Sequence, residues 1–145
     1  MGTVSNEEKK KFLWGYRDSV RRIRRIESEI EELRTMRMSA STGRGGGGSR
    51  GWKNDLSSYA ATLDSLEREL EEERKARVQA YERVEAAINA LEDTREQDVL
   101  FYRYIKGLAW WEIAEKTLYS DRHVRRLHGW GLLHLRIKDV LECPE

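Results

Sequence analysis

Two long segments with an apolar residue at every third or fourth position constrain this chain more than any other feature. The first runs from about Asn6 to Met38 and the second from about Lys53 to Leu91. This spacing places the apolar side chains along one face of a helix. Each segment therefore predicts one long helix with a narrow apolar seam. The seam residues are Leu13, Tyr16, Val20, Ile23, Ile26, Ile30, Leu33 and Met36 in the first helix, and Leu56, Tyr59, Leu63, Leu66, Leu70, Ala80, Val84, Ala87 and Leu91 in the second.

A glycine-rich segment, residues 39–51, separates the two predicted helices. Six of its thirteen residues are glycine, a composition typical of a flexible linker. The alternative is a phosphate-binding loop, but such a loop needs a Lys-Ser or Lys-Thr ending between a strand and a helix, and the segment has neither. We therefore expect residues 1–92 to form a long antiparallel coiled-coil hairpin with a flexible loop at 39–51.

The distribution of charge favours an antiparallel pairing of the two helices. Residues 17–25 include five arginines, and residues 67–73 include five glutamates. These segments face each other if paired residue numbers sum to about 90, and each exposed ion pair then contributes about 0.3–0.5 kcal/mol. These ion pairs would therefore determine the register of the two helices more than they would stabilise the hairpin. Alternatively, the arginine run is a second nucleic-acid patch, although the glutamates would neutralise most of its field.

The segment 107–138 has the pattern of a helix-turn-helix motif. We expect a short helix over 110–117, a tight turn over 118–120 and a second helix that begins at Asp121. The Ser120 hydroxyl can cap the second helix, because it accepts a hydrogen bond from a backbone N–H that has no partner within the helix. Four apolar residues then occupy the inward-facing positions: Ile113, Tyr119, Val124 and Leu127.

Small and charged residues fit the same motif. Ala114 is small at the point where the two helices would cross closely. Arg122, Arg125 and Arg126 fall on the outer face of the second helix, where a recognition helix meets base edges and phosphates in the major groove. Residues 116–138 contain six Lys or Arg and one acid, although the whole chain has a net charge of only +1. This concentration is typical of phosphate contact, and an ordinary solvated face is the alternative.

A further helix should precede this motif, from Asp93 to Lys106. Thr94 can cap it, with Gln97 near the position of a capping box, and Gly107 tolerates the left-handed geometry that ends a helix. Residues 93–145 are therefore expected to form a small helix-turn-helix domain. Its predicted core comprises Val99, Leu100, Tyr104, Leu108, Trp110, Ile113, Ala114, Val124, Leu127 and Leu135, and Trp111 is expected to be exposed.

Two glycines lie within the last predicted helix. Gly129 and Gly131 each cost about 1 kcal/mol relative to alanine inside a helix. We therefore expect this helix to kink or fray beyond His128.

Three features of the run from Ala90 to Ile137 resemble a known family. They are the helix that contains Val99-Leu100 and Tyr104-Ile105, the Trp-x-x-Ile-Ala sequence of the next helix, and the Ser-x-Arg-x-Val sequence that opens the last. Together they are similar to the fourth conserved region of bacterial sigma factors, and more closely to the RinA-type phage transcriptional regulators.

The resemblance implies that double-stranded DNA is the partner and that the last helix enters the major groove. The contact residues would be Ser120, Arg122, His123, Arg125 and Arg126. It also raises contact with RNA polymerase as an open alternative. One departure concerns Ala109, which stands where relatives commonly place a capping Ser or Thr, so the first helix of the motif should hold a phosphate less well.

Other classes of protein find little support in the sequence. His123, His128 and His134 are not spaced to share one helical face, and no zinc-binding motif accompanies them, so we expect no metal, no cofactor and no enzymatic activity. A membrane span and a secretory signal are not expected either, because no run of about 18 apolar residues occurs. The single Cys143 fits a reducing cytoplasm.

Two hypotheses about function follow from the sequence. The first is a sequence-specific DNA-binding transcriptional regulator, encoded by a phage or prophage. The second is an interaction or assembly protein in which the coiled coil does the work. A phage DNA-packaging recognition subunit shares the chemistry of the first. A homodimer is also expected, because four aromatic residues look unpartnered in the sequence: Phe12, Trp14, Trp52 and Tyr81.

Overall fold

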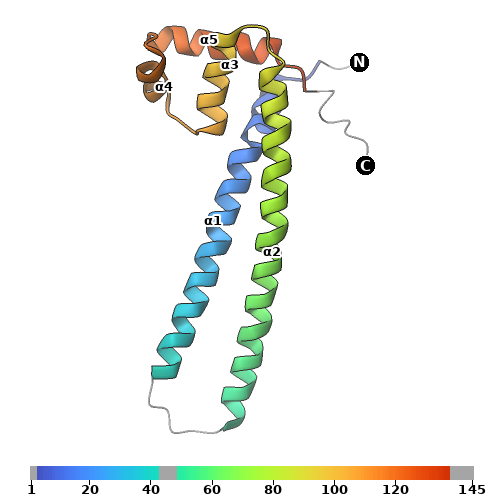
Figure 1. Cartoon of the computed structure of the whole chain (residues 1–145), viewed down its shortest axis with the longest axis vertical. Helices are drawn as coiled ribbons and strands as arrows, with labels where there is room; N and C mark the ends of the chain where they lie inside the picture. Colours follow the sequence, from blue (N-terminus) through green and yellow to red (C-terminus); the bar gives the residue numbers. More distant parts are fainter. Residues whose placement is uncertain (1–2, 43–48, 138–145) are drawn as a thin grey trace. The chain divides into compact units, whose positions relative to one another are not determined.

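The computed structural model describes residues 3–42 and 49–137. Within these residues every regular element is a helix, which confirms the predicted all-α class. Two long helices that run in opposite directions are followed by shorter ones (Figure 1). The elements are α1 (Asn6–Thr42), α2 (Ser49–Asn89), α3 (Thr94–Leu100), the π-helical turn η1 (Phe101–Ile105), α4 (Trp110–Thr117) and α5 (Asp121–His134).

Both long helices extend further toward the glycine-rich segment than the sequence indicates. The predicted linker at 39–51 is therefore too long, because α1 continues to Thr42 and α2 begins at Ser49. Adding one residue to a helix that is already formed costs little, so the Ser, Ala and Thr residues at 39–42 continue α1. The rest of the predicted loop, residues 43–48, lies outside the described residues.

The chain divides into two compact units. One comprises Val20–Ala76, and we call it the arm unit. The other comprises Met1–Ser19 together with Arg77–Glu145, and we call it the head unit. Each unit therefore contains part of α1 and part of α2, and the short helices belong to the head unit.

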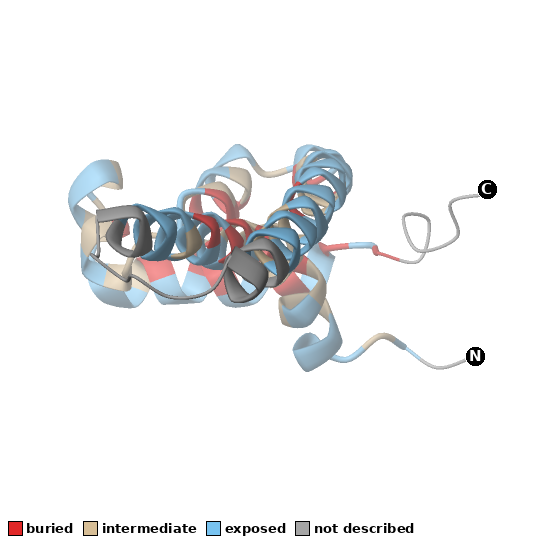
Figure 2. Cartoon of the chain, turned by 90° about the horizontal axis from the view of Figure 1, so that it is seen from below, coloured by how far each residue is buried: buried red, intermediate tan, exposed pale blue. Residues whose placement is uncertain are grey.

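In the arm unit, α1 and α2 pack through a narrow apolar seam. Ile23, Ile26 and Ile30 of α1 are buried together with Leu70 of α2, and Leu63 and Leu66 pack against them. Buried residues lie between the helices and exposed residues on their outer sides (Figure 2). The predicted hairpin is thus confirmed.

The register of the hairpin differs from the predicted one. Arg22 pairs with Glu73, at 2.9 Å between nitrogen and oxygen, rather than with a residue near position 68. Arg34 pairs with Glu67 at 3.7 Å. The interlocking isoleucine and leucine side chains set this register, because burying apolar surface stabilises more than an exposed ion pair does. An arginine of 17–25 still meets a glutamate of 67–73, as the charge pattern predicts.

The core of the head unit consists of two clusters. One combines Leu13 of α1 and the end of α2 with the short helices, and the other lies among the short helices. The predicted domain boundary at residues 92 and 93 coincides with the connection between α2 and α3, but buried contacts continue across it. The clusters are Leu13, Val84, Ala87, Ile88, Leu91, Leu100, Tyr104, Ile105, Leu132, Leu135 and Ile137, and Val99, Ile113, Val124 and Leu127.

The residue that caps α3 is Asp93 rather than the predicted Thr94. The Asp93 carboxylate accepts a hydrogen bond from the backbone N–H of Arg95 at 2.9 Å. Gln97 does not complete a capping box. Its side-chain amide donates instead to the Leu91 carbonyl at 2.5 Å, and this bond ties α3 to the connection that follows α2. An aspartate caps a helix at least as well as a threonine does. The cap therefore lies one residue earlier than predicted, and Thr94 is the first residue of the helix.

A π-helical turn follows α3, which the apolar spacing does not reveal. A π turn contains one more residue than an α turn, so it changes which side chains face inward. In η1 the neighbouring residues Tyr104 and Ile105 are both buried. Gly107 then adopts a φ of +70°, which confirms its predicted role at the helix end. The Arg17 guanidinium lies so close to Gly107 that a Cβ there would come within 2.8 Å of it.

The predicted fraying of the last helix beyond His128 is wrong. Helix α5 continues to His134, and the backbone N–H of Leu135 still bonds to the Gly131 carbonyl at 2.9 Å. A Cβ at Gly131 would lie 3.1 Å from the side chain of Leu100. The glycine therefore permits a close approach of α3 and α5, and the packing gained there offsets the helical cost.

Aromatic residues that looked unpartnered in the sequence pack inside the head unit. The Trp14 ring lies edge-on to Tyr104, with centroids 4.8 Å apart. Tyr81 makes a similar contact with Tyr16 at 5.4 Å, and Phe12 packs against the same core. These three residues therefore give no reason to expect a dimer. The side chain of the fourth, Trp52, lies outside the described part of the chain.

Candidate nucleic-acid interface

Helices α4 and α5 have the connectivity of a helix-turn-helix, and both bounds of α4 and the start of α5 are those that the sequence predicts. Leu118 ends α4 in the left-handed conformation, with a φ of 61°, and the chain turns there. The Ser120 hydroxyl accepts a hydrogen bond from the His123 backbone N–H at 3.1 Å, so it caps α5 as predicted. Ile113, Val124 and Leu127 are fully buried between the helices, with Ala114 and Tyr119 packed beside them.

The start of α4 lacks a capping side chain. Ala109 occupies the capping position and has no side-chain oxygen, while the Glu112 carboxylate accepts a hydrogen bond from the Ala109 N–H at 3.1 Å. The carboxylate also places negative charge at the first turn, where the helix dipole favours it. This arrangement is less suited to holding a phosphate at the start of α4, as the sequence implies.

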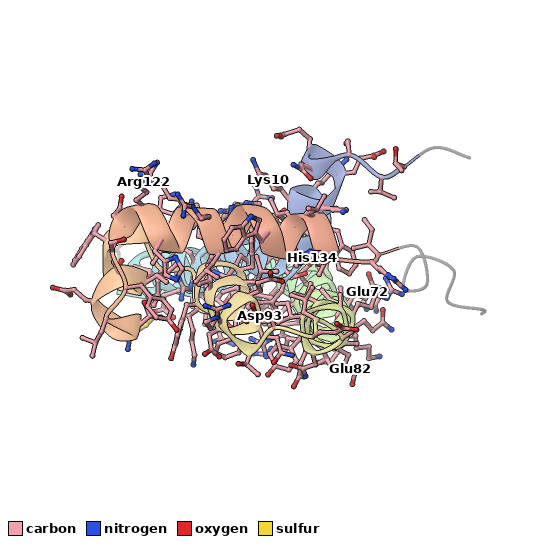
Figure 3. The ribbon with its side chains drawn as sticks, turned by 90° about the horizontal axis from the view of Figure 1, so that it is seen from above. Lys10, Glu72, Glu82, Asp93, Arg122 and His134 are labelled. Atoms are coloured by element: carbon pink, nitrogen blue, oxygen red, sulfur yellow. The ribbon has the colours of Figure 1, made fainter. Side chains whose placement is uncertain are left out.

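The outer face of α5 carries the three predicted arginines. Arg122, Arg125 and Arg126 are all exposed, while the opposite face of the helix is buried. Arg122 projects from α5 into solvent (Figure 3). Arg125 forms an exposed ion pair with Asp121 at 3.3 Å, one helical turn earlier. An exposed pair of this kind is worth at most about 1 kcal/mol, so it leaves the guanidinium free to exchange partners.

Two other predicted contact residues have contacts of their own within the head unit. The Ser120 side chain is exposed but already accepts the capping hydrogen bond. The His123 ring is half-buried and lies edge-on to Tyr119, with centroids 5.0 Å apart. The structure thus brings all five predicted residues to the start of α5, with the arginines the most available of them.

A buried tyrosine–histidine pair supports α5 from inside. The Tyr104 hydroxyl and Nε2 of His128 are 2.7 Å apart and hydrogen-bonded. Burial lowers the pKa of His128 to about 4, and the positive charges of Lys10 and Arg103 lower it further. Burial likewise raises the pKa of Tyr104 to about 12. Both groups are therefore neutral at pH 7, which suits a buried hydrogen bond.

Aromatic rings and cations surround this pair. The Trp110 ring lies edge-on to His128, with centroids 4.7 Å apart. The Arg103 guanidinium lies 4.3 Å from the Trp110 centroid, and that of Arg125 lies 5.9 Å from it. Arg103 also donates to the Leu108 carbonyl at 3.0 Å. One side of α5 is therefore lined by cations from different parts of the chain.

The other side of α5 carries a carboxylate. Glu96 of α3 is buried, and its two oxygens lie 3.0 and 3.1 Å from Nδ1 of His134. Such a pair fixes the end of α5 against α3. The helix thus has one cationic side and one side where an acid is already engaged.

Sequence reasoning missed two lysines of α1 that lie beside α5. The Lys9 ammonium donates to the Leu132 carbonyl at 2.6 Å and lies 3.5 Å from the Leu133 carbonyl. A cation is favourable at this C-terminal end of the helix because of the unpaired carbonyls and the dipole. Lys10 follows directly. The lysine run at 9–11 is visible in the sequence, but nothing there connects it to a helix more than a hundred residues later.

Among residues 3–42 and 49–137, no group of three or more His, Cys, Asp or Glu side chains is placed to hold a metal ion. None of the helices in these ranges has both the length and the apolar character needed to cross a membrane.

Comparisons with protein-family models, with curated proteins and with solved structures found no match to this chain. The class of site thus rests on its geometry: a short helix-turn-helix whose second helix is buried on one face and arginine-rich on the other.

Proposed function

We propose that the chain is a sequence-specific double-stranded DNA-binding transcriptional regulator that reads the major groove with α5. The observation that carries this proposal is the division of α5 into two faces. Val124 and Leu127 are fully buried, and Arg122 and Arg126 are exposed one helical turn apart. A helix fixed in this way can present guanidinium groups to guanine edges and phosphates without rearrangement.

The chemistry of arginine favours duplex DNA over other anionic partners. Guanidinium groups form paired hydrogen bonds with guanine O6 and N7, and each such pair contributes about 1–3 kcal/mol of discrimination against a wrong base. The same groups bind phosphates when they reach the backbone instead. A phage origin, as well as contact with RNA polymerase, is part of the proposal through the sequence resemblance. Exposed Trp111 of α4 and Leu118, which directly follows α4, offer a surface for such a protein contact.

The direct test replaces Arg122, Arg125 and Arg126 together with alanine. We expect binding to a duplex with the selected sequence to fall at least a hundredfold, since several contacts of about 1–3 kcal/mol are lost. Helical content by circular dichroism should stay unchanged, because all three side chains are exposed. Wild-type affinity with an unaltered salt dependence would show that α5 is not the reading helix.

A matched control is available in the arm unit. Arg24, Arg25 and Arg68 are also exposed, and Arg25 pairs with Glu29 one turn later, much as Arg125 pairs with Asp121. Replacing these three arginines with alanine removes the same charge. We expect this control to keep most of the affinity and the same preferred sequence.

An assembly role for the arm unit is the second candidate. It is favoured by exposed apolar side chains on the long helices of this unit, since Met36 is 58% exposed and Leu56 is 38% exposed. Sedimentation at micromolar concentration would test it through self-association. A 17.1 kDa particle would argue against a homodimer, whereas a particle of twice that mass would support one. Footprinting on phage DNA would separate a regulator from a packaging subunit.

A further inference from the structure

The first turns of α1 are fastened to the far end of α5. The Lys9 ammonium donates to the Leu132 carbonyl at 2.6 Å, near the last turn of α5. Leu13, one turn further along α1, is fully buried in the same core cluster as Leu132. The start of α1 is therefore held beside α5, although 123 residues separate Lys9 from Leu132 in the sequence.

Lys10 lies on the same side of α5 as Arg122 in Figure 3. Trp110 contacts the buried His128 ring and lies under the guanidinium groups of Arg103 and Arg125. Besides burial, the positive charges of Lys10 and Arg103 lower the pKa of His128. We call Lys10, Arg103 and Arg125 the basic flank.

Lys10 and Arg122 project on the same side of α5 in Figure 3. The Asp93 carboxylate, which is labelled on the other side, pairs with Arg95 at 3.0 Å. Lys10 is 40% exposed, and its ammonium lies 3.4 Å from the almost fully exposed Glu7 carboxylate. Such an exposed pair is weak and screened by salt, so Lys10 can exchange Glu7 for a phosphate.

We infer that the basic flank is a phosphate track, in which Lys10 of α1 binds the backbone of the same DNA strand that Arg125 meets. This inference rests on the proposed function and adds a partner contact outside the helix-turn-helix. Leu132, whose carbonyl binds Lys9, lies seven residues after Arg125, two turns along the same face of α5 and about 10 Å away.

The consequence is a division of labour between the two chain segments. Phosphate contacts fix the position of a protein on the duplex and carry no sequence information, whereas contacts to base edges select the sequence. Lys10 therefore strengthens binding to every duplex alike. Because α1 supplies it, the N-terminal turns of the long helix are part of the DNA-binding surface and not only of the hairpin.

The test replaces Lys10 with glutamine and measures binding by fluorescence anisotropy. The probes are a short duplex of mixed sequence and a duplex enriched by selection, between about 50 and 200 mM salt. We expect affinity for both to fall several-fold, and the slope of log affinity against log salt to become shallower by about 0.9. The preferred sequence should not change.

Two further variants sharpen this test. Lys11→Gln is the matched control, since Lys11 is exposed on the adjacent face of α1 and lines a groove with Phe12 and Arg83. It should keep the wild-type salt slope. Glu7→Gln removes the competing carboxylate, so affinity should rise rather than fall.

The outcomes separate this inference from the proposed function. If Lys10→Gln and Lys11→Gln behave alike while the α5 arginine triple variant loses binding, the phosphate track is wrong and the regulator stands. If the wild-type chain does not bind the duplexes, both fail. A changed sequence preference in Lys10→Gln would also overturn the inference, because it would mean a base contact.

Discussion

The arm unit and the head unit are built from the same two long helices but are stabilised differently. In the arm unit, one seam of isoleucine and leucine is flanked by exposed ion pairs. In the head unit, the largest fully buried side chains of the described residues come together, among them Tyr104, Leu13 and Ile113. The comparison teaches that a helical pair alone buries a stripe, whereas a third and fourth helix are needed to enclose a core.

This difference bears on function, because a helix presents its exposed side chains in a defined direction only when its other face is packed in a core. An arginine face has a defined direction only when the opposite face of its helix is held, as Val124 and Leu127 hold α5. The arm unit also carries arginines, but some of them, such as Arg22 and Arg34, pair with glutamates of the partner helix. Exposed arginines therefore form a candidate DNA-reading surface in the head unit, whereas some of those in the arm unit form ion pairs between the two long helices.

The largest effect is expected from truncating the two kinds of core. Leu127→Ala in the head unit should lower the free energy of unfolding by about 2–5 kcal/mol, because a fully buried leucine leaves a cavity. Leu63→Ala in the arm unit should cost about half as much or less, since Leu63 is only half-buried. Urea denaturation followed by circular dichroism measures both. Equal losses would contradict the contrast between the units.

Acid should weaken the head unit through His128. The unfolded histidine takes up a proton near its ordinary pKa of 6.5, whereas the folded one does so only near 4. The contribution of His128 to the free energy of unfolding is therefore fully present above pH 6.5 and is lost as the pH drops from 6.5 to 4. The total loss is about 3 kcal/mol, at about 1.36 kcal/mol per pKa unit.

The variant His128→Gln isolates this effect, because it keeps every other titrating group. Unfolding free energies of both proteins, measured at several pH values, should show a smaller fall for the variant between pH 6.5 and 4. Parallel curves would mean that His128 is not held neutral by the fold.

The two glycines of α5 provide a matched pair with a smaller effect. A Cβ at Gly129 meets nothing within 4 Å, so Gly129→Ala should stabilise the protein by about 1 kcal/mol through helix propensity. A Cβ at Gly131 comes 3.1 Å from Leu100, so Gly131→Ala should gain less or lose stability. Thermal unfolding compares them. An equal gain for both would show that α3 and α5 are not packed closely at Gly131.

The smallest effect belongs to the ion pairs of the arm unit. Arg22→Ala should cost about 0.3–0.5 kcal/mol at low salt, and less as salt increases, because the pair with Glu73 is partly exposed. Unfolding midpoints at two salt concentrations measure this. A loss above about 2 kcal/mol would mean that the pair behaves as a buried one.

Periodicity and capping residues predict most of the fold. Both bounds of α4, the start of α5, the Ser120 cap and the turn at Gly107 follow from local chemistry that acts within a few residues. The spacing of apolar residues also places Val124 and Leu127 inward. These features are predictable because each depends on neighbouring residues alone.

The features that the sequence does not reveal depend on distant contacts. Gly131 reads as a helix breaker, yet its lack of a side chain serves the approach of Leu100. The hairpin register depends on which isoleucines and leucines interlock. The charge pattern alone predicts a partner for Arg22 that lies more than one helical turn from its actual partner, Glu73. Lys9 meets a carbonyl 123 residues later. In the candidate interface, the arginines of α5 are therefore predictable, and Lys10 and Arg103 are not.

The most direct measurement is a selection of duplexes from a random pool, carried out with the wild-type chain and with the variant that lacks Arg122, Arg125 and Arg126. Our account predicts a defined, enriched sequence for the wild-type chain, and weak enrichment without a preferred sequence for the variant. It would be contradicted if the wild-type chain enriched no sequence, or if both proteins enriched the same one with equal strength.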